Sequence, residues 1–147
     1  VFTSRDSGTV IGTAICYESV YGNYYREYIH KGANVMSIIT NDGWWLDSPG
    51  YRQHLWFDQL RAIETRRSIA RCGNTGVSAL INQRGDISAS TEWWTRSVLK
   101  GKLNLNEKIT TFVKYGDFIG RIAYASMLIF IALAILSLLK ISAKAKE

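Results

Sequence analysis

The stretch Gly12-Thr-Ala-Ile-Cys16-Tyr-Glu18 runs from a predicted buried strand directly into a predicted helix. Residues 9–15 are small or β-branched, which is typical of a strand. From Val20 onward, large apolar residues recur at the spacing of one helix face, and the helix is expected to end at Lys31-Gly32. Cys16 is therefore expected at the junction of the strand and the helix.

Cys16 has two interpretations at this junction. A sharp turn would lift its side chain out of the sheet and aim it at the positive end of the helix dipole, where a thiolate is favoured and can act as a nucleophile. A free cysteine is also commonly a small buried hydrophobe that fills core volume. Its position alone leaves both roles open.

The rest of the body predicts an α/β fold. Residues 33–40 form a short apolar run before Asn41-Asp-Gly, so that strand, helix and strand make a βαβ unit with a parallel sheet. The further predicted elements are a loop at 44–50, a helix at 51–71, a hairpin with strands near 77–81 and 87–89, and a strand at 97–105.

The charge of the chain does not indicate a nucleic-acid partner. The 147 residues carry a formal net charge of +6, and 47% of them are hydrophobic, enough for a real core. Four arginines fall on the predicted helix at 51–71 and are interleaved with Glu64, which favours a partly solvated row of ion pairs; they are Arg61, Arg66, Arg67 and Arg71. No nucleic-acid-binding motif is visible. Because the chain begins with Val1 in strand-like sequence, we expect the carboxy-terminal piece of a longer protein.

The tail predicts a transmembrane helix. Residues 122–139 form an uncharged apolar run between Arg121 and Lys140, about 27 Å long as a helix and close to the thickness of a bilayer core. A buried core helix is the alternative, but it would be expected to show a polar face. The chain then ends in a short basic tail, and the positive-inside tendency predicts that residues 141–147 are cytoplasmic and that the body lies on the other side of the membrane.

Several motifs resemble those of the nitrilase (carbon–nitrogen hydrolase) superfamily, in the same order and at similar spacing. They are Ile15-Cys16-Tyr17-Glu18, Thr40-Asn41-Asp42-Gly-Trp44-Trp45, Gln53-His54, Arg61-Ala62-Ile63-Glu64 with Arg67, and Arg71-x-x-Asn74-Thr75-Gly76. The Cys-Tyr-Glu triplet, the Gln-His pair and Tyr115-Gly-Asp117 before a final apolar span resemble in particular the bacterial apolipoprotein N-acyltransferases of that superfamily. The resemblance covers nearly the whole chain.

The resemblance implies part of an αββα sandwich at residues 1–117, a transmembrane helix at 118–140 and a short tail at 141–147. It also implies a Glu-Lys-Cys triad in which Glu is the general base, Lys stabilises the oxyanion and Cys forms an acyl-enzyme. Cys16 matches the nucleophile, and Tyr17 and Glu18 match residues that support activity. The triad Glu and Lys precede the cysteine in the family, and too little sequence precedes Cys16 here to contain them. We therefore expect this segment to be inactive by itself.

The implied reaction moves a fatty acyl chain from a membrane phospholipid to the N-terminal amine of a diacylated apolipoprotein through a cysteine thioester. The implied location is the bacterial inner membrane, with the catalytic domain on the periplasmic side. No cofactor is implied, and the two cysteines and two histidines show no zinc-site spacing. Two rival functions are an amidase that hydrolyses a small amide and a tail-anchored protein of the same fold without catalysis.

The remaining site expectations concern aromatic and small residues. Trp44, Trp45 and Asn41 are candidates for substrate binding, and core packing is the equal alternative for Trp44. Trp93 and Trp94 could line an acyl-chain pocket, rest at lipid headgroups or belong to the core. Cys72 stands where the family usually has a small residue, so we expect it to fill core volume. A Cys16–Cys72 disulfide would disable the nucleophile and is not expected.

Overall fold

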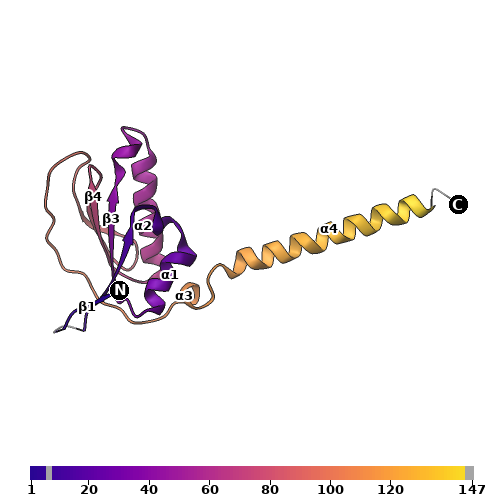
Figure 1. Ribbon diagram of the computed structural model, residues 1–147, viewed down its shortest axis with the longest axis horizontal. Helices are drawn as coiled ribbons and strands as arrows, with labels where there is room; N and C mark the ends of the chain where they lie inside the picture. The colour runs from indigo at the N-terminus through magenta and orange to yellow at the C-terminus, as the bar shows by residue number, and fades with distance from the viewer. Residues whose placement is uncertain (6–7, 145–147) are drawn as a thin grey trace. The chain divides into compact units, whose positions relative to one another are not determined.

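A computed structural model describes the backbone of residues 1–5 and 8–144 and the side chains of those up to residue 138. These residues form two separate units, Val1–Gly116 and a carboxy-terminal unit that begins at Asp117. The first unit is a mixed sheet with helices, and the second is a single long helix (Figure 1). The predicted α/β class is therefore confirmed.

The sheet has six strands in the order β1-β2-β3-β4-β5-β6. The three central strands, β2 (Val10–Ile15), β3 (Val35–Asn41) and β4 (Ile69–Asn74), are parallel. β1 (Phe2–Thr3) pairs antiparallel with β2, while β5 (Ala79–Ile81) and β6 (Ile87–Ser90) extend the other edge as an antiparallel hairpin. The parallel strands are joined by helices, as the predicted βαβ unit requires.

Helices α1 (Gly22–His30) and α2 (Gly50–Thr65) cover one face of this sheet (Figure 1). The core on that face contains alternate residues of the central strands and the inner faces of both helices; these include Ala14, Met36, Ile38 and Ile69 with Tyr25, Ile29 and Ala62. Gly12 of β2 allows this close packing, because a Cβ there would lie 2.5 Å from the sulfur of Met36 and 2.9 Å from Tyr28. One α layer thus packs on one β layer.

The opposite face of the sheet is largely open. Ile15 and Ile39 are partners across β2 and β3, yet their side chains are 63% and 50% exposed. Cys72 is the partner of Ile39 on β4 and is also exposed. The expectation that Cys72 fills core volume is wrong, because its strand position points to the open face. Within the described residues, this face has no second sheet packed on it.

The expected helix after Cys16 forms in two parts. A short 3-10 helix, η1 (Cys16–Val20), comes first, and Tyr21 is extended before α1 begins at Gly22. Only the short helix starts at Cys16, so the α-helix dipole that we expected to act on the thiol starts six residues later. The predicted end of the helix is confirmed, with Lys31 as the C-cap and Gly32 at a φ of +93°.

The predicted helix at 51–71 is too long. α2 ends at Thr65, Arg66 takes a left-handed φ of 52° as its C-cap, and β4 follows. The predicted row of solvated arginines is also wrong, since Arg61, Arg67 and Arg71 are only 5%, 1% and 3% exposed.

Arg67 shows why a charged residue is stable in this interior. Its guanidinium donates to the carbonyl oxygens of Ala33 (2.8 Å), Thr65 (3.1 Å) and Lys108 (2.9 Å). It therefore satisfies backbone acceptors of three segments at once. Of the predicted ion pairs, the contact between Arg61 and Glu64 is confirmed at 3.1 Å.

Two other predictions about the body have different outcomes. The hairpin is confirmed, and its turn is closed by Asn82, whose side-chain oxygen accepts from the backbone N–H of Arg84 and Asp86. The predicted strand at 97–105 is wrong, because residues 95–110 have no regular structure. This segment leads to the short helix α3 (Thr111–Tyr115), whose first turn is capped by Thr110.

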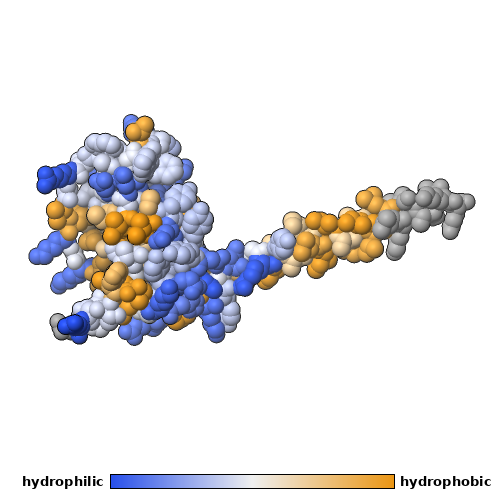
Figure 2. Space-filling view, viewed as in Figure 1, coloured by the Kyte–Doolittle hydropathy of each residue, from blue (hydrophilic) through white to orange (hydrophobic). Residues whose placement is uncertain are grey.

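The second unit contains the predicted long apolar helix, α4 (Phe118–Lys144). Its described part, Phe118–Leu138, has a mean hydropathy of 2.2 and no buried residue in its most apolar window. Apolar side chains cover much of the face of this helix that Figure 2 shows, and the absence of buried residues in the window does not favour the alternative of a buried core helix. By its length and composition, this helix could cross a membrane. Lys140, Lys144 and Lys146 of the predicted basic tail lie outside the residues whose side chains are described.

Candidate active site around Cys16

Cys16 occupies a tight turn directly after Ile15, the last residue of β2. Its φ is 52°, in the left-handed region that residues other than glycine rarely adopt. The hydroxyl of Ser19 donates to the Cys16 carbonyl oxygen at 3.3 Å, across the turn. The thiol is free and half-buried. The sequence therefore places this side chain at the end of a parallel strand, where open α/β sheets commonly bind ligands.

Glu18 holds the turn in place by hydrogen bonds on the side of the turn that faces solvent. Its carboxylate accepts from the backbone N–H of Ile15 (2.8 Å) and from the hydroxyls of Tyr24 (3.2 Å) and Tyr28 (3.0 Å). The hydrogen bond from Ile15 and those from the two tyrosines lower the pKa of Glu18 despite its partial burial. Burial and the neighbouring Glu18 raise the pKa of Tyr28. Glu18 is thus an ionised acceptor that holds the turn, and its supporting role in activity stays a prediction.

A buried polar cluster lies behind the turn. The Thr40 hydroxyl lies 3.4 Å from the Cys16 sulfur and 3.0 Å from Oδ1 of Asp42. His54 of α2 contacts the same Oδ1 through Nδ1 at 2.9 Å, and because a carboxylate can only accept, Nδ1 carries the proton. Its Nε2 lies 3.3 Å from the Cys16 carbonyl oxygen and 3.2 Å from the Ser19 hydroxyl. The cluster therefore reaches both the thiol and the backbone of Cys16.

Arg71 of β4 closes the cluster. Its guanidinium donates to the carboxylates of Asp42 and Asp58, and all three side chains are at most 3% exposed. Burial alone would raise the pKa of Asp42, but the hydrogen bond from His54 and the charges of Arg71 and His54 outweigh it and lower the pKa. Burial raises the pKa of Asp58 despite Arg71. A Cβ at Gly76 would lie 2.6 Å from Oδ2 of Asp42, so this position leaves room for the cluster only as glycine.

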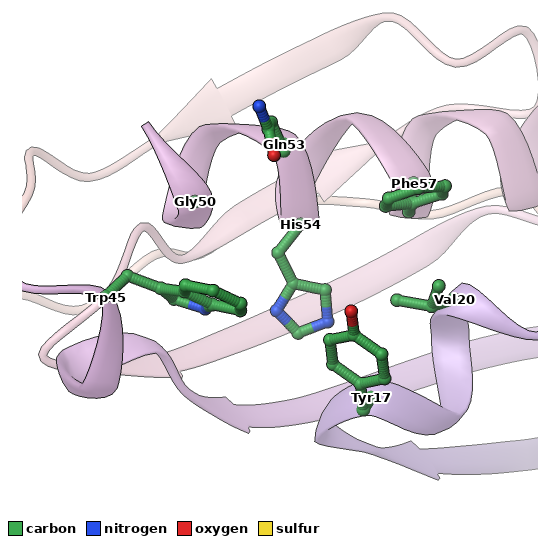
Figure 3. A pocket seen from close by; sticks show the side chains of 7 residues that line it. All are labelled: Tyr17, Val20, Trp45, Gly50, Gln53, His54 and Phe57. Atoms are coloured by element: carbon green, nitrogen blue, oxygen red, sulfur yellow. The ribbon is translucent and has the colours of Figure 1, made fainter. Parts of the chain in front are cut away.

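Two hollows lie next to the turn. A small one of ≈ 30 Å³, with room for about one water molecule, has His54 between Trp45 and Tyr17 (Figure 3). The second is an open groove of ≈ 690 Å³ on the outer side of Cys16. Its lining is mostly aromatic and apolar, and consists of Ile15, Cys16, Tyr17, Glu18, Tyr21, Asn23 and Tyr24. Of these two hollows, the groove is the one with space for a chain of several carbon atoms.

The structure brings together some of the predicted site residues and separates others. Tyr17 borders both hollows, and Trp45 borders the small one. Trp44 borders neither and is 82% exposed, so the alternative of core packing for Trp44 is wrong. The Asn41 side-chain oxygen accepts from the Gly43 N–H and from the Thr75 hydroxyl, which makes it the cap of the short helix η2 (Asp42–Trp45). Substrate contact by Asn41, Trp44 and Trp45 stays a prediction.

The distal tryptophans do not reach this groove. Trp93 stacks on Tyr51 with ring centroids 4.0 Å apart, and Trp94 beside it is 58% exposed. Trp93 thus covers the start of α2.

The buried cluster is what sequence reasoning missed. Thr40, Asp42, His54 and Arg71 all belonged to motifs that were noticed, but no role followed from the motifs. Thr40 and Asp42 are two residues apart, but the contacts of Thr40 with Cys16, of His54 with Asp42 and of Arg71 with Asp42 join residues 24, 12 and 29 positions apart, so no local pattern pairs them. Among the described residues, no group of three or more His, Cys, Asp or Glu side chains could hold a metal ion.

Comparison with known proteins gives consistent results. A family model described as carbon-nitrogen hydrolase matches residues 1–111. The chain is 40% identical over 119 residues to an apolipoprotein N-acyltransferase of Chlorobaculum tepidum and 32% identical over 124 residues to one of Geobacter metallireducens. These matches cover 80% and 84% of this chain but only 22% and 24% of the relatives. The chain thus spans about a quarter or less of the length of these curated relatives.

Solved structures share the fold at low sequence identity. A carbon-nitrogen hydrolase from Helicobacter pylori superposes with a TM-score of 0.58 at 13% identity, over 64% of this chain and 40% of that one. A member of branch 10 of the nitrilase superfamily from Saccharomyces cerevisiae gives a TM-score of 0.50 at 18% identity, over 58% of this chain and 34% of that one. The α layer and β layer seen here thus match part of the fold of those two proteins.

Proposed function

This chain belongs to the carbon–nitrogen hydrolase family, and on that premise we propose that it is the carboxy-terminal part of an apolipoprotein N-acyltransferase. The observation that carries the proposal is a cysteine on a strained turn that opens into an apolar groove, in a chain that continues into an apolar helix. In this proposal residues 1–117 belong to the catalytic domain, 118–140 cross the membrane and 141–147 form the tail. An amidase that acts on small amides would have no use for the groove or the helix.

The first half-reaction forms a thioester on Cys16. The thiol gives its proton to the general base, and the thiolate attacks the ester carbonyl of a phospholipid to give a tetrahedral oxyanion. When this collapses, the C–O bond breaks, the acyl group stays on sulfur and the lysophospholipid leaves as an alcohol after it takes up the proton. The resemblance places the base, a Glu, and the oxyanion-stabilising Lys before Cys16 in a longer chain.

The second half-reaction consumes the thioester. The neutral N-terminal amine of a diacylated lipoprotein attacks the thioester carbonyl, the C–S bond breaks, and the amide forms. The base takes the proton that the amine loses and passes it to the departing sulfur, so the thiol of Cys16 is regenerated. A thiolate suits both steps, because it is a good nucleophile and a good leaving group.

The groove supports a lipid substrate. Ile15, Tyr21 and Tyr24 are each at least half exposed beside Cys16, and Tyr17 is 48% exposed. Such an apolar and aromatic surface gains stability by contact with an acyl chain at about 25 cal/mol per Å² of apolar area removed from water. Tyrosine rings also suit the boundary between lipid and water, since one end is apolar and the other is wet.

The test is direct detection of the acyl-enzyme. The full-length protein in detergent is incubated with a phospholipid that carries a defined acyl chain, and the mass of the peptide that contains Cys16 is measured. We expect a mass increase of one acyl group that is lost on addition of a diacylated lipopeptide, with equal gain of mass by the lipopeptide.

Two variants control this experiment. Cys16→Ala is expected to abolish both signals, whereas Cys72→Ala should leave them unchanged because Cys72 lies on another strand, away from the groove. Acylation of the Cys16→Ala protein would place the nucleophile elsewhere. Acylation followed only by release of free fatty acid would favour a hydrolase.

The proposed location is the bacterial inner membrane with the catalytic domain on the periplasmic side. Lysines at 140, 144 and 146 follow the apolar run at 122–139, which favours a cytoplasmic end. A reporter fused after Glu147 should be active in the cytoplasm, while one inserted at the exposed turn near Arg84 should be active in the periplasm. Reporters that agree on one side would refute a membrane-crossing α4.

A further inference from the structure

The hydroxyl of Thr40 lies between the nucleophile and a buried carboxylate. It is 3.4 Å from the Cys16 sulfur and 3.0 Å from Oδ1 of Asp42, and the residue is only 4% exposed. A threonine hydroxyl has one proton, so it can donate to one of these neighbours and must act as an acceptor toward the other. Which neighbour receives the proton depends on the ionisation state of the thiol.

With a neutral thiol, the arrangement is determined by the carboxylate. Asp42 is ionised at neutral pH, since its pKa is lowered, and an ionised carboxylate can only accept. Thr40 therefore donates to Asp42, and its oxygen accepts the S–H of Cys16. The thiol, the hydroxyl and the carboxylate then form a chain of hydrogen bonds that all point toward Asp42.

With a thiolate, the direction of one bond reverses. The sulfur has no proton and becomes an acceptor, so rotation about the Cβ–Oγ1 bond turns the Thr40 proton to the sulfur. Asp42 is not left unsatisfied, because Oδ1 still accepts from His54 Nδ1 at 2.9 Å and Oδ2 from Arg71. The reversal therefore costs little at Asp42, while the thiolate gains a hydrogen bond to a charged acceptor.

We propose that Thr40 is a catalytic residue whose hydroxyl donates a hydrogen bond to the Cys16 thiolate and turns back to donate to Asp42 when the sulfur is protonated or acylated. No atom is transferred in this step, since the proton stays on the Thr40 oxygen throughout. The role in acyl transfer rests on the proposed function. The hydrogen bond to the thiolate does not, and it can be measured by simple alkylation.

Other ionisable groups also surround the sulfur. In the part of the chain that the structure describes, Tyr17 and Glu18 come from η1, Asp42 from η2 and His54 from α2, with Arg71 and Asp58 behind them. Of these groups, Asp42 loses a hydrogen bond when Thr40 loses its hydroxyl, but it still accepts from His54 and Arg71, which lower its pKa more than Thr40 does. We therefore expect Asp42 to stay ionised in a Thr40 variant, so that the change at Cys16 reports the lost hydroxyl.

The test compares Thr40→Val with Thr40→Ser in the full-length protein. Valine keeps the branched shape and removes the hydroxyl, whereas serine keeps the hydroxyl. Iodoacetamide forms an S–C bond with the thiolate and releases iodide, and the rate at Cys16 is read from its tryptic peptide by mass spectrometry. At about pH 7 we expect Thr40→Val to react about tenfold more slowly, the effect of losing one hydrogen bond to a charged group, and Thr40→Ser to stay within about twofold.

Two controls separate this effect from a general change of structure. The rate at exposed Cys72 in the same sample should be equal in all three proteins. At about pH 10, where thiols are ionised without help, the Cys16 rates of Thr40→Val and the unaltered protein should converge. Equal Cys16 alkylation rates in Thr40→Val and the unaltered protein at neutral pH would refute the proposal. A Thr40→Ser protein that reacts as slowly as Thr40→Val would refute it as well. Failure of acyl-enzyme formation in the unaltered protein would refute the proposed function instead, and leaves the alkylation result standing.

Discussion

The two sides of Cys16 differ in composition and in completeness. Behind it, Thr40, Asp42, His54 and Arg71 are at most 4% exposed and join one another by hydrogen bonds. In front of it, the groove is open and its aromatic rings are about half exposed. The described residues thus hold the nucleophile in place by themselves. The surface that would meet a substrate, in contrast, is not covered by any other part of the described chain.

This difference predicts where the chain tolerates substitution. The rear cluster contains charges that water cannot reach, so the loss of one partner leaves another unpaired. The front groove is wet, and water can replace a lost contact there. The following experiments test that contrast in order of decreasing effect, using unfolding of the full-length protein in detergent followed by tryptophan fluorescence.

The largest effect is expected from Arg71→Met. It removes the guanidinium that both Asp42 and Asp58 face, and leaves two buried carboxylates without it. We expect a loss of about 3–5 kcal/mol in the free energy of unfolding. The matched control is Arg84→Met, which breaks the exposed pair between Arg84 and Asp86 and should leave the unfolding midpoint unchanged. Equal effects of the two substitutions would remove the contrast between the buried cluster and the surface.

A smaller effect is expected from acid. The pKa of Asp42 is lowered from its ordinary value of 3.8, so its contribution to stability is present above that value and is lost as the pH falls through the lower pKa of the folded state. Asp58 has a raised pKa, so its ionised form is disfavoured in the folded state and its contribution has the opposite sign.

The measurement is the unfolding free energy of the Asp42→Asn and Asp58→Asn proteins at about pH 3 and about pH 5. Asp42→Asn should make stability less dependent on pH over this range than in the unaltered protein. Asp58→Asn should make the fall in stability toward low pH steeper. A steeper fall in Asp42→Asn would mean that its carboxylate is not the stabilised form.

The smallest effect is expected at the border between the two sides. Tyr28 and Tyr24 both donate to Glu18, but Tyr28 packs against the core, whereas Tyr24 is 50% exposed. Tyr28→Phe should lower the unfolding free energy by about 1 kcal/mol, because no water replaces the lost donor. Tyr24→Phe should lower it by no more than about 0.3 kcal/mol, because water can bind Glu18 in its place. A larger loss of unfolding free energy in Tyr24→Phe than in Tyr28→Phe would show that the groove is closed to water in the folded protein.

The same contrast explains what the sequence could predict. The turn at Cys16, the βαβ unit and the hairpin follow from local patterns: strand-like residues before Cys16, helical spacing after it, and turn residues at 82–86. β4 was missed because it carries Arg71 in a buried strand, and three neighbouring arginines favoured a solvated helix. A buried arginine becomes predictable only when its partners are known, and here they lie 13 and 29 residues away.

The residues of the site also divide into those within one local motif and those joined by contacts between distant segments. Cys16 and Glu18 were predicted from one motif, because both belong to one turn. Thr40 and His54 stood in motifs as well, yet their part in the site depends on contacts that cross from β3 and α2 to the turn. Packing of helix on sheet makes those contacts, and no periodicity in the sequence records them.

Arg67 also sets an order on folding. Its guanidinium is satisfied only when the carbonyls of Ala33, Thr65 and Lys108 are all in place, and the last of these lies 41 residues further along the chain. A closed loop of that length forms late, since its entropy is lost before its contacts are gained. During synthesis from the N-terminus, this final step therefore waits for Lys108, which emerges only about ten residues before α4 begins at Phe118. Completion of the body and emergence of the apolar helix thus become nearly simultaneous events in biosynthesis.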